Sequence, residues 1–306
     1  MTIYFGGNIW SYRKMAPTAI VIFYVLSLFG SFANALNQLS FSGGGSFGAV
    51  EIGILKRLQE LENRKYDLYT GISAGALNAG YLSYYKNLDL GIKSAEVLYS
   101  NIRTKMIYDL FPNTGVSLFN TDPLKKTLAN IVQTMPNIPA IHTLIGATNM
   151  YSGKLDIYNF EDQTDDDKVR LLMSSSAIPG MFPPIKFKEQ LYADGGTLSN
   201  ELIDVEHDDT YLNITFITPY EDYAYNDTPI HSIKDMLCRT AMIVLSNFNN
   251  PISSINENCR VPIGEINKYY VPPDVLKGYN ILNFDKGEEL VDIGYKNMIH
   301  KRFSLC

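Results

Sequence analysis

Ser73 is the first candidate for chemistry in this 306-residue chain, because glycines flank it in the stretch Gly71-Ile72-Ser73-Ala74-Gly75. Gly-x-Ser-x-Gly is typical of a nucleophilic serine presented on a sharp turn between a strand and a helix. An apolar run precedes the motif and a helix-favouring run follows it, as that setting requires. Ordinary tight turns also produce this pattern, so the remaining residues must decide between the two interpretations.

A glycine-rich segment, Gly43-Gly44-Gly45-Ser46-Phe47-Gly48, comes earlier in the chain, after an expected strand and before an expected helix. Its Gly-x-Gly-x-x-Gly spacing matches the dinucleotide-binding fingerprint, which needs an acidic residue at the end of the second strand. That strand ends at Thr70-Gly71, and its acidic residue, Asp67, lies near its start. The nucleotide interpretation is therefore disfavoured, and no Lys-Ser or Lys-Thr pair follows Gly48 to make a phosphate-binding loop.

The alternative for the same segment is an oxyanion hole. Backbone amides of Gly43, Gly44 and Gly45, at a helix N-terminus, would stabilise the negative oxygen that forms when a serine attacks an ester carbonyl. Glycines let the backbone approach a substrate closely. In a parallel sheet this loop and the Ser73 turn lie at the same edge of adjacent strands, so the two loops together are more specific than either alone.

A serine nucleophile needs a base, and the strongest candidate is Asp194. It ends an expected strand and is followed by Gly195 and Gly196, which leave space for other backbone. The histidines are weaker candidates, because His207 lies in an acidic loop and His300 lies beside basic residues near the C-terminus. A carboxylate next to the serine would take its proton directly and, unless burial raises its pKa, would stay ionised in mildly acidic solution.

The elements that must hold these residues alternate between strands and helices, which indicates a parallel sheet covered by helices. Apolar periodicity predicts strands at 37–42, 66–70, 142–148, 154–160, 186–192 and 211–218, and helices at 49–62, 74–85, 89–107, 121–132 and 232–248. The acidic run 165–167 is predicted to be the first turn of a further helix and not a metal site. No linker interrupts residues 36–306, so they are expected to form one domain.

Residues 1–35 differ in composition from the rest of the chain. They contain no acidic residue, and two basic residues precede the apolar run 16–29. Small residues then complete the layout of a secretory signal peptide cleaved after Ala35, which predicts a secreted protein. The alternative is an uncleaved membrane anchor formed by residues 16–35.

The formal net charge of −6 argues against a nucleic-acid partner held by a basic surface. A secretory route would permit a disulfide between Cys238 and Cys259, with Cys306 left over, and three unpaired thiols are the alternative. No spacing of cysteine and histidine resembles a zinc site.

The sequence contains two glycosylation sequons. Asn213 falls within an expected strand and is expected to be unmodified, whereas Asn226 lies in a loop and is the better acceptor.

Four segments together resemble the patatin-like phospholipases. They are the glycine-rich segment 43–48, the serine motif 71–75, the stretch 175–184 and Asp194-Gly195-Gly196, in the family's order along the chain. The resemblance implies a lipid acyl hydrolase with a three-layer α/β/α fold and a mainly parallel central sheet. It also implies a catalytic dyad of Ser73 and Asp194, with no histidine and no cofactor.

The resemblance implies a phospholipase A or lysophospholipase that acts on glycerolipids or phospholipids at a membrane or lipid-droplet surface. Many family members carry a basic residue where this chain has Phe47, which makes neutral glycerolipids such as triacylglycerol an alternative substrate. A catalytically idle lipid-binding relative is an alternative function. Apolar loop residues could enter a lipid surface beside the site or cover the protein's own core: Phe111, Leu118, Phe119, Met181 and Phe182.

Overall fold

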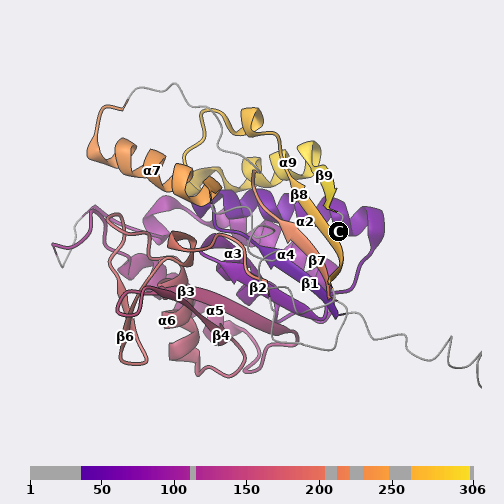
Figure 1. Cartoon of the computed structure of the whole chain (residues 1–306), viewed down its shortest axis with the longest axis horizontal. Coiled ribbons are helices and arrows are strands. Elements are labelled where there is room, and N and C mark those ends of the chain that lie inside the picture. The colour runs from indigo at the N-terminus through magenta and orange to yellow at the C-terminus, as the bar shows by residue number, and fades with distance from the viewer. Residues whose placement is uncertain (1–35, 111–114, 204–211, 221–229, 248–262, 304–306) are drawn as a thin grey trace, which may run out of the picture.

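A nine-stranded sheet runs through the molecule in the order β5-β6-β3-β2-β1-β7-β8-β9, with β4 paired to β3 (Figure 1). The computed structural model describes residues 36–110, 115–203, 212–220, 230–247 and 263–303. The strands are β1 (Leu36–Phe41), β2 (Leu68–Ile72), β3 (His142–Asn149), β4 (Lys154–Asn159), β5 (Ile185–Phe187), β6 (Gln190–Ala193), β7 (Leu212–Ile217), β8 (Ile263–Tyr270) and β9 (Ile299–Phe303).

The centre of the sheet is parallel, because β1 pairs in parallel with β2 and β7, β2 with β3, and β7 with β8. In this register Phe41 lies opposite Gly71, so the loops after β1 and β2 emerge at the same edge of the sheet. The predicted α/β class with a mainly parallel central sheet is confirmed. The edge of the sheet where these loops meet is where a parallel sheet places its site.

Helices α2 and α3 follow β1 and β2 and pack, together with α6, against the sheet, while α4, α5 and α9 pack against these helices. The helices are α2 (Gly48–Glu62), α3 (Ala74–Leu82), α4 (Leu88–Asn101), α5 (Asp122–Thr134), α6 (Asp165–Ser175), α7 (Ile233–Asn247) and α9 (Gly287–Asn297). Two short 3-10 turns matter for the site, η1 (Gly45–Phe47) and η3 (Gly195–Thr197).

Alternation along β1 shows how both faces of the central strands are covered. Leu39 and Phe41 belong to the main hydrophobic core with the helices. Gln38 and Ser40 point to the other face, where both side chains donate hydrogen bonds to the carbonyl of Leu202, at 2.7 and 3.0 Å. An extended segment after η3 therefore crosses that face, and polar side chains of the buried strand satisfy its backbone.

Two predicted elements differ from the structure. The single strand predicted at 186–192 is a hairpin of β5 and β6, because Lys188 and Glu189 take positive φ angles of 44° and 60° and reverse the chain. This conformation at both central residues is that of a tight two-residue hairpin turn. The helix predicted at 89–107 ends at Asn101, since Ile102 is extended.

The acidic run 165–167 begins α6, as predicted, and the Thr164 side chain accepts the amide of Asp167 as an N-cap. The C-terminal elements β8, α9 and β9 were not predicted individually. Strands β8 and β9 form one edge of the sheet, and helix α9 packs along α2.

Several predictions fall on residues outside the described ranges, namely the signal peptide or anchor at 1–35 and the roles considered for Phe111, His207, Asn226, Cys259 and Cys306. Cys238, the one cysteine within the described ranges, has a free, buried thiol 3.9 Å from Oδ1 of Asn280, which agrees with the alternative of unpaired thiols. In the part of the chain that is described, every helix is too short or too polar to cross a bilayer.

Candidate active site

The pairing of β3 with its neighbours brings Ser73 and Asp194 together although 121 residues separate them. Strand β4 occupies one edge of β3 from Leu144 to Asn149, so β2 and β6 must share the other edge. Strand β2 runs along that edge until Ile72 lies opposite Gly146, and the antiparallel β6 runs toward it until Ala193 lies opposite Thr148. The next residue of each strand is Ser73 or Asp194, so the two strands deliver them to the same point.

Ser73 lies on a strained turn, with φ of 54° and ψ of −122°. A positive φ is unfavourable for serine and persists only where the surroundings hold it, as at a nucleophile elbow. The turn also needs glycine at position 75, because a Cβ atom there would lie 2.4 Å from the carbonyl oxygen of Phe41. The spacing of the motif therefore reflects close packing of the elbow against β1.

Ser175, at the end of α6, holds this elbow in place. Its hydroxyl accepts the backbone amide of Ser73 at 2.9 Å and donates to the carbonyl of Gly146 at 2.7 Å. The neighbouring Ala177 carbonyl accepts the amide of Asp194 at 2.9 Å. The same short segment thus positions the backbone of both candidate residues, a role that no local pattern in the sequence had indicated.

The two candidate side chains are in direct contact. Ser73 Oγ donates to Asp194 Oδ2 at 2.7 Å, and Asp194 Oδ1 accepts the backbone amide of Gly196 at 2.8 Å. Both residues are buried. The serine hydroxyl thus points at a carboxylate whose other oxygen is already held, so that its orientation is set before any substrate arrives.

Burial raises the pKa of the Asp194 carboxyl to about 7, and the hydrogen bonds from Ser73 and Gly196 only partly offset that effect. A carboxylate removed from water loses solvation, which favours its neutral form. Burial is the exception that the sequence analysis named, so this group is not expected to stay fully ionised in mildly acidic solution. A pKa near neutrality is also where a general base works best at neutral pH.

The glycine-rich loop provides amides for an anion, although not the predicted set. The amide of Gly43 is occupied, because it donates to Oδ1 of Asn200 at 3.0 Å. Within the described ranges, the amides of Gly44, Gly45 and Ala74 donate to no protein acceptor. Ala74 directly follows the candidate nucleophile and begins α3, so its amide joins those of Gly44 and Gly45 from the predicted set as the candidate oxyanion hole, and the Gly43 amide is left out.

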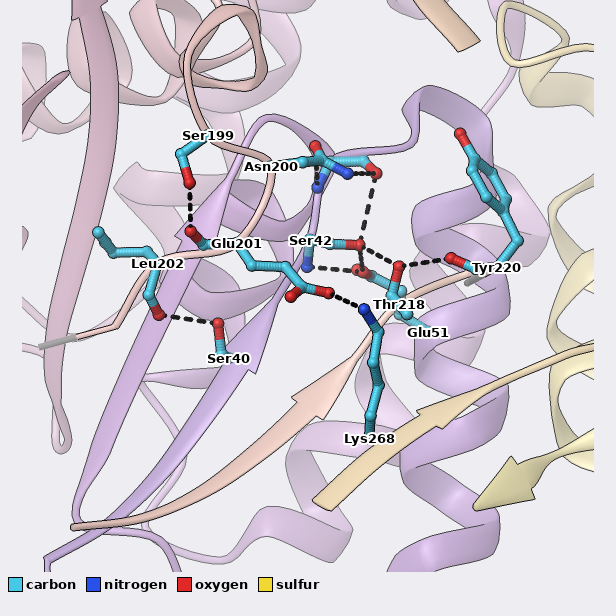
Figure 2. A network of polar contacts seen from close by, with 11 residues as sticks. Ser40, Ser42, Glu51, Ser199, Asn200, Glu201, Leu202, Thr218, Tyr220 and Lys268 are labelled. Carbon is cyan, nitrogen blue, oxygen red and sulfur yellow. Dashed lines mark hydrogen bonds and ion pairs between the residues drawn. The ribbon is translucent and has the colours of Figure 1, made fainter. Parts of the chain in front are cut away.

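Asn200 ties the glycine-rich loop to the segment after η3. Its side-chain oxygen accepts the amide of Gly43 at 3.0 Å, and its side-chain nitrogen donates to the Gly43 carbonyl at 3.2 Å (Figure 2). A Cβ atom on Gly43 would lie 2.4 Å from Asn200 Oδ1, so the loop has no space for a larger residue at this position. Asn200 was not singled out from the sequence, since nothing near it in the chain shows that it faces β1.

Beneath this loop, the buried carboxylate of Glu51 anchors the end of β1 (Figure 2). It accepts the Ser42 amide at 2.9 Å and the side-chain amide of Asn78 at 2.8 Å. Ser42 Oγ in turn lies 2.8 Å from Thr218 Oγ1 on the neighbouring chain segment. Desolvation raises the pKa of Glu51 well above its usual value, and the network fixes the residue from which the glycine-rich loop starts.

We expect Glu51→Ala to lower the free energy of unfolding by about 3 kcal/mol, because it leaves the buried donors on Ser42 and Asn78 without an acceptor. Urea denaturation measures the change. The matched control is Glu60→Ala on the exposed side of the same helix, expected to stay within about 1 kcal/mol of the parent. Equal losses in the two variants would contradict the anchoring role.

The described histidines contact neither candidate residue. His142 pairs with Glu161, the backbone of His231 bonds to Asp235, and His300 bonds to Asn267 Oδ1 at 2.8 Å. His300 lies on β9, which is separated from β2 by β1, β7 and β8. Nor do the described residues contain a cluster of three or more acidic, histidine or cysteine side chains arranged to bind a metal.

Most of the apolar loop residues considered for lipid contact belong to the core. Phe119, Met181 and Phe182 are buried, and Leu118 packs half-buried against them. The two loops pair through backbone hydrogen bonds, from the Leu118 amide to the Gly180 carbonyl at 3.1 Å and from Phe119 to Met181 at 3.0 Å. Tertiary packing thus selects the core-covering role for these four residues.

Comparison with known proteins matches residues 39–206 to the family model described as Patatin-like phospholipase. "Probable lipid hydrolase 463L" of Invertebrate iridescent virus 6 is 27% identical over 187 residues, covering 55% of this chain and 62% of the relative. "Uncharacterized protein R571" of Acanthamoeba polyphaga mimivirus is 22% identical over 205 residues, covering 61% of this chain and 67% of the relative. The chain therefore spans somewhat less than two thirds of the viral lipid hydrolase it matches.

Two solved structures are also similar over most of the chain. The crystal structure of VipD from Legionella pneumophila aligns with a TM-score of 0.38 and 15% identity, covering 88% of this chain and 68% of that one. ExoU, in its heterodimeric complex with SpcU from Pseudomonas aeruginosa, aligns with a TM-score of 0.31 and 13% identity, covering 88% and 53%.

Proposed function

The chain belongs to the patatin-like phospholipase family, and we propose that it hydrolyses carboxylic esters of glycerolipids as a phospholipase A or lysophospholipase. The observation that carries this proposal is the 2.7 Å contact between Ser73 Oγ and Asp194 Oδ2, beside the amides of Gly44, Gly45 and Ala74, which have no acceptor among the described residues. A hydroxyl, a base and an anion site are the parts that acyl transfer needs. The experiment that tests it is ester hydrolysis by the parent and by the Ser73→Ala variant.

In the proposed first step, Asp194 accepts the hydroxyl proton of Ser73 while Oγ attacks the ester carbonyl carbon. The carbonyl π bond breaks and its electron pair moves to oxygen, where the amides of Gly44, Gly45 and Ala74 would stabilise the negative charge. The N-terminus of α3 adds its partial positive charge at the same place. The negative charge on the carbonyl oxygen thus develops where backbone amides already point.

The tetrahedral intermediate then collapses. The bond to the leaving alkoxide breaks, and the protonated Asp194 gives its proton to that oxygen, which leaves an acyl group on Ser73. Asp194 next removes a proton from water, whose oxygen attacks the acyl carbon. When this second tetrahedral intermediate collapses, the bond between the acyl carbon and Ser73 Oγ breaks, its electron pair stays on Oγ and Asp194 returns the proton there. The fatty acid is released, and the carboxylate has served as base and acid in turn.

We expect kcat/KM to fall as the pH is lowered through about 7, because the base must be ionised and its pKa is raised to about 7. The value at pH 5 should be about a hundredfold below that at pH 8, as expected for one essential group. Initial rates with a soluble p-nitrophenyl ester measure the profile, with far-UV circular dichroism to verify folding at each pH. A flat profile down to pH 5 would contradict a raised pKa.

Triacylglycerol or another neutral glycerolipid is the second candidate substrate. Phe47, at the position where many family members have a basic residue, is buried and packs edge-on against Tyr220 with ring centroids 6.1 Å apart. This position therefore offers no cation for a phosphate group. Parallel assays with phosphatidylcholine vesicles and triacylglycerol emulsions separate the two candidates, and activity on neither would favour a lipid-binding relative without catalysis.

We further propose that the site works at a lipid surface and that α7 contributes to its contact. Helix α7 packs against η3, which directly follows Asp194. Its residues Ile233 and Met236 are exposed by 70% and 55%, and Ile230 just before the helix is also exposed. Apolar side chains gathered in this way beside a site favour contact with lipid.

We also propose that residues 1–35 direct the protein into the secretory pathway. N-terminal sequencing of the protein from a secretory host tests this proposal.

A further inference from the structure

An apolar cavity between α3, α4 and α5 reaches the glycine-rich loop. It contains about 790 Å³ of space not filled by atoms, including solvent at its mouth. Gly45 and Ala74 line the end nearest the candidate oxyanion hole, and hydrocarbon side chains of the three helices form most of the rest. Its wall is predominantly apolar, as is typical of sites that bind small molecules.

Most polar side chains in the wall form hydrogen bonds with other groups of the protein. Asn78 donates to the Gly48 carbonyl at 2.9 Å, the Tyr99 hydroxyl donates to Asn78 Oδ1 at 2.7 Å, and Thr127 donates to the Met106 carbonyl at 2.9 Å. Tyr81 shares a hydrogen bond of 2.6 Å with Ser94. Of the described wall residues, Tyr84 alone has a buried hydroxyl without a partner. Such a wall offers little to water and suits a hydrocarbon.

The cavity extends along α3, away from the candidate catalytic residues. Both Ala74 and Tyr81 line it, and seven residues of helix span about 10 Å. Beyond Tyr81 the wall includes Tyr84 and Phe160, whose rings meet edge-on with centroids 6.1 Å apart. Phe160 is fully buried, so this aromatic pair ends the cavity inside the core.

We propose that this cavity binds the acyl chain of the substrate, and that the Tyr84–Phe160 pair limits the length of chain it accepts. The inference rests on the proposed hydrolase function, because it places the chain next to the ester that Ser73 attacks. An ester whose carbonyl oxygen lies against the amides of Gly45 and Ala74 has its acyl chain at the mouth of the cavity. A single unbranched chain fits a space bounded by three helices and closed at one end.

The proposal predicts how the rate depends on chain length. Each methylene that leaves water for an apolar wall should raise kcat/KM about fourfold, until the chain end meets the closed end and the increase stops. The probes are p-nitrophenyl esters from butanoate to palmitate at one pH, below their aggregation limits. The parent protein should therefore show a rise followed by a plateau or a fall.

Two variants should shift this profile in opposite directions. Leu98→Trp fills the cavity from α4 and should lower the ratio of long-chain to short-chain kcat/KM by about tenfold or more. Phe160→Leu removes part of the closed end and should move the plateau to longer chains. The matched control is Leu90→Trp, also on α4 but 58% exposed and outside the cavity, which should keep the parent profile.

The outcomes separate this inference from the function on which it rests. Ser73-dependent hydrolysis with the same chain-length profile in the parent, Leu98→Trp and Phe160→Leu proteins would overturn the cavity assignment and leave the hydrolase proposal intact. If no ester is hydrolysed, the hydrolase proposal fails. Binding of a fluorescent fatty acid, anthroyloxy-palmitate, then still tests the cavity, because Leu98→Trp should weaken it at least about tenfold relative to Leu90→Trp. Equal binding by these two variants would overturn the inference, and if Leu98→Trp does not fold, the Phe160→Leu profile decides.

Discussion

Replacing Ser73 with alanine is expected to abolish ester hydrolysis, with a fall in kcat of at least about 10⁴-fold, while the fold is retained. The hydroxyl is the only part of the elbow that the substitution removes. The backbone contacts that hold the elbow, from Ser175 and from the start of α3, do not involve the Ser73 side chain. Rates with p-nitrophenyl butanoate and with phospholipid vesicles measure the loss, and thermal unfolding measures the fold.

The matched control for this variant is Ser100→Ala on α4. The Ser100 hydroxyl donates a hydrogen bond to the Val97 carbonyl at the protein surface. It should leave the rate within a few-fold of the parent. A folded Ser73→Ala protein that hydrolyses both substrates at the parental rate would remove the basis for an enzyme with this nucleophile.

Asp194→Asn is expected to be almost as damaging, with a loss of about 10²–10⁴-fold in kcat. The amide has nearly the shape of the carboxylate but cannot accept the proton from Ser73 Oγ. His300→Ala and His207→Ala are the controls and should each stay within a few-fold of the parent. Loss of activity in either histidine variant as well as in Asp194→Asn would indicate a Ser-His-Asp triad instead of a dyad.

The Asp194→Asn variant also has an expected effect on stability, which distinguishes a buried carboxylate from one exposed to solvent. The pKa of Asp194 is raised from 3.8 to about 7, so the neutral carboxyl favours the folded state at low pH. That contribution is present below pH 3.8 and is lost as the pH rises through about 7. At pH 8 the asparagine variant should therefore unfold at a higher temperature than the parent, and a lower unfolding temperature would contradict a desolvated carboxylate.

Much of the fold and of the candidate site followed from local sequence. Apart from the hairpin of β5 and β6 and the early end of α4, the strands and helices through Asn247 lie close to their predicted positions, because apolar periodicity and glycine placement report local backbone geometry. Ser73 and Asp194 were identifiable because each directly follows a strand and has glycines beside it. Those glycines are needed where other backbone comes too close for a side chain. The turn at 188–189 was not identifiable, since neither Lys188 nor Glu189 is a residue that usually takes a positive φ.

The sequence by itself determined the two glycine loops, the serine between them and the parallel order of the strands that carry them. The tertiary structure alone decided that β2 and β6 meet along one edge of β3, which places Asp194 against Ser73. It also decided that Asn200 occupies the Gly43 amide and that burial raises the pKa of Asp194. Glycine patterns report steric needs within a few residues, whereas strand pairing, burial and desolvation arise from segments far apart in the chain, which only the assembled fold brings together.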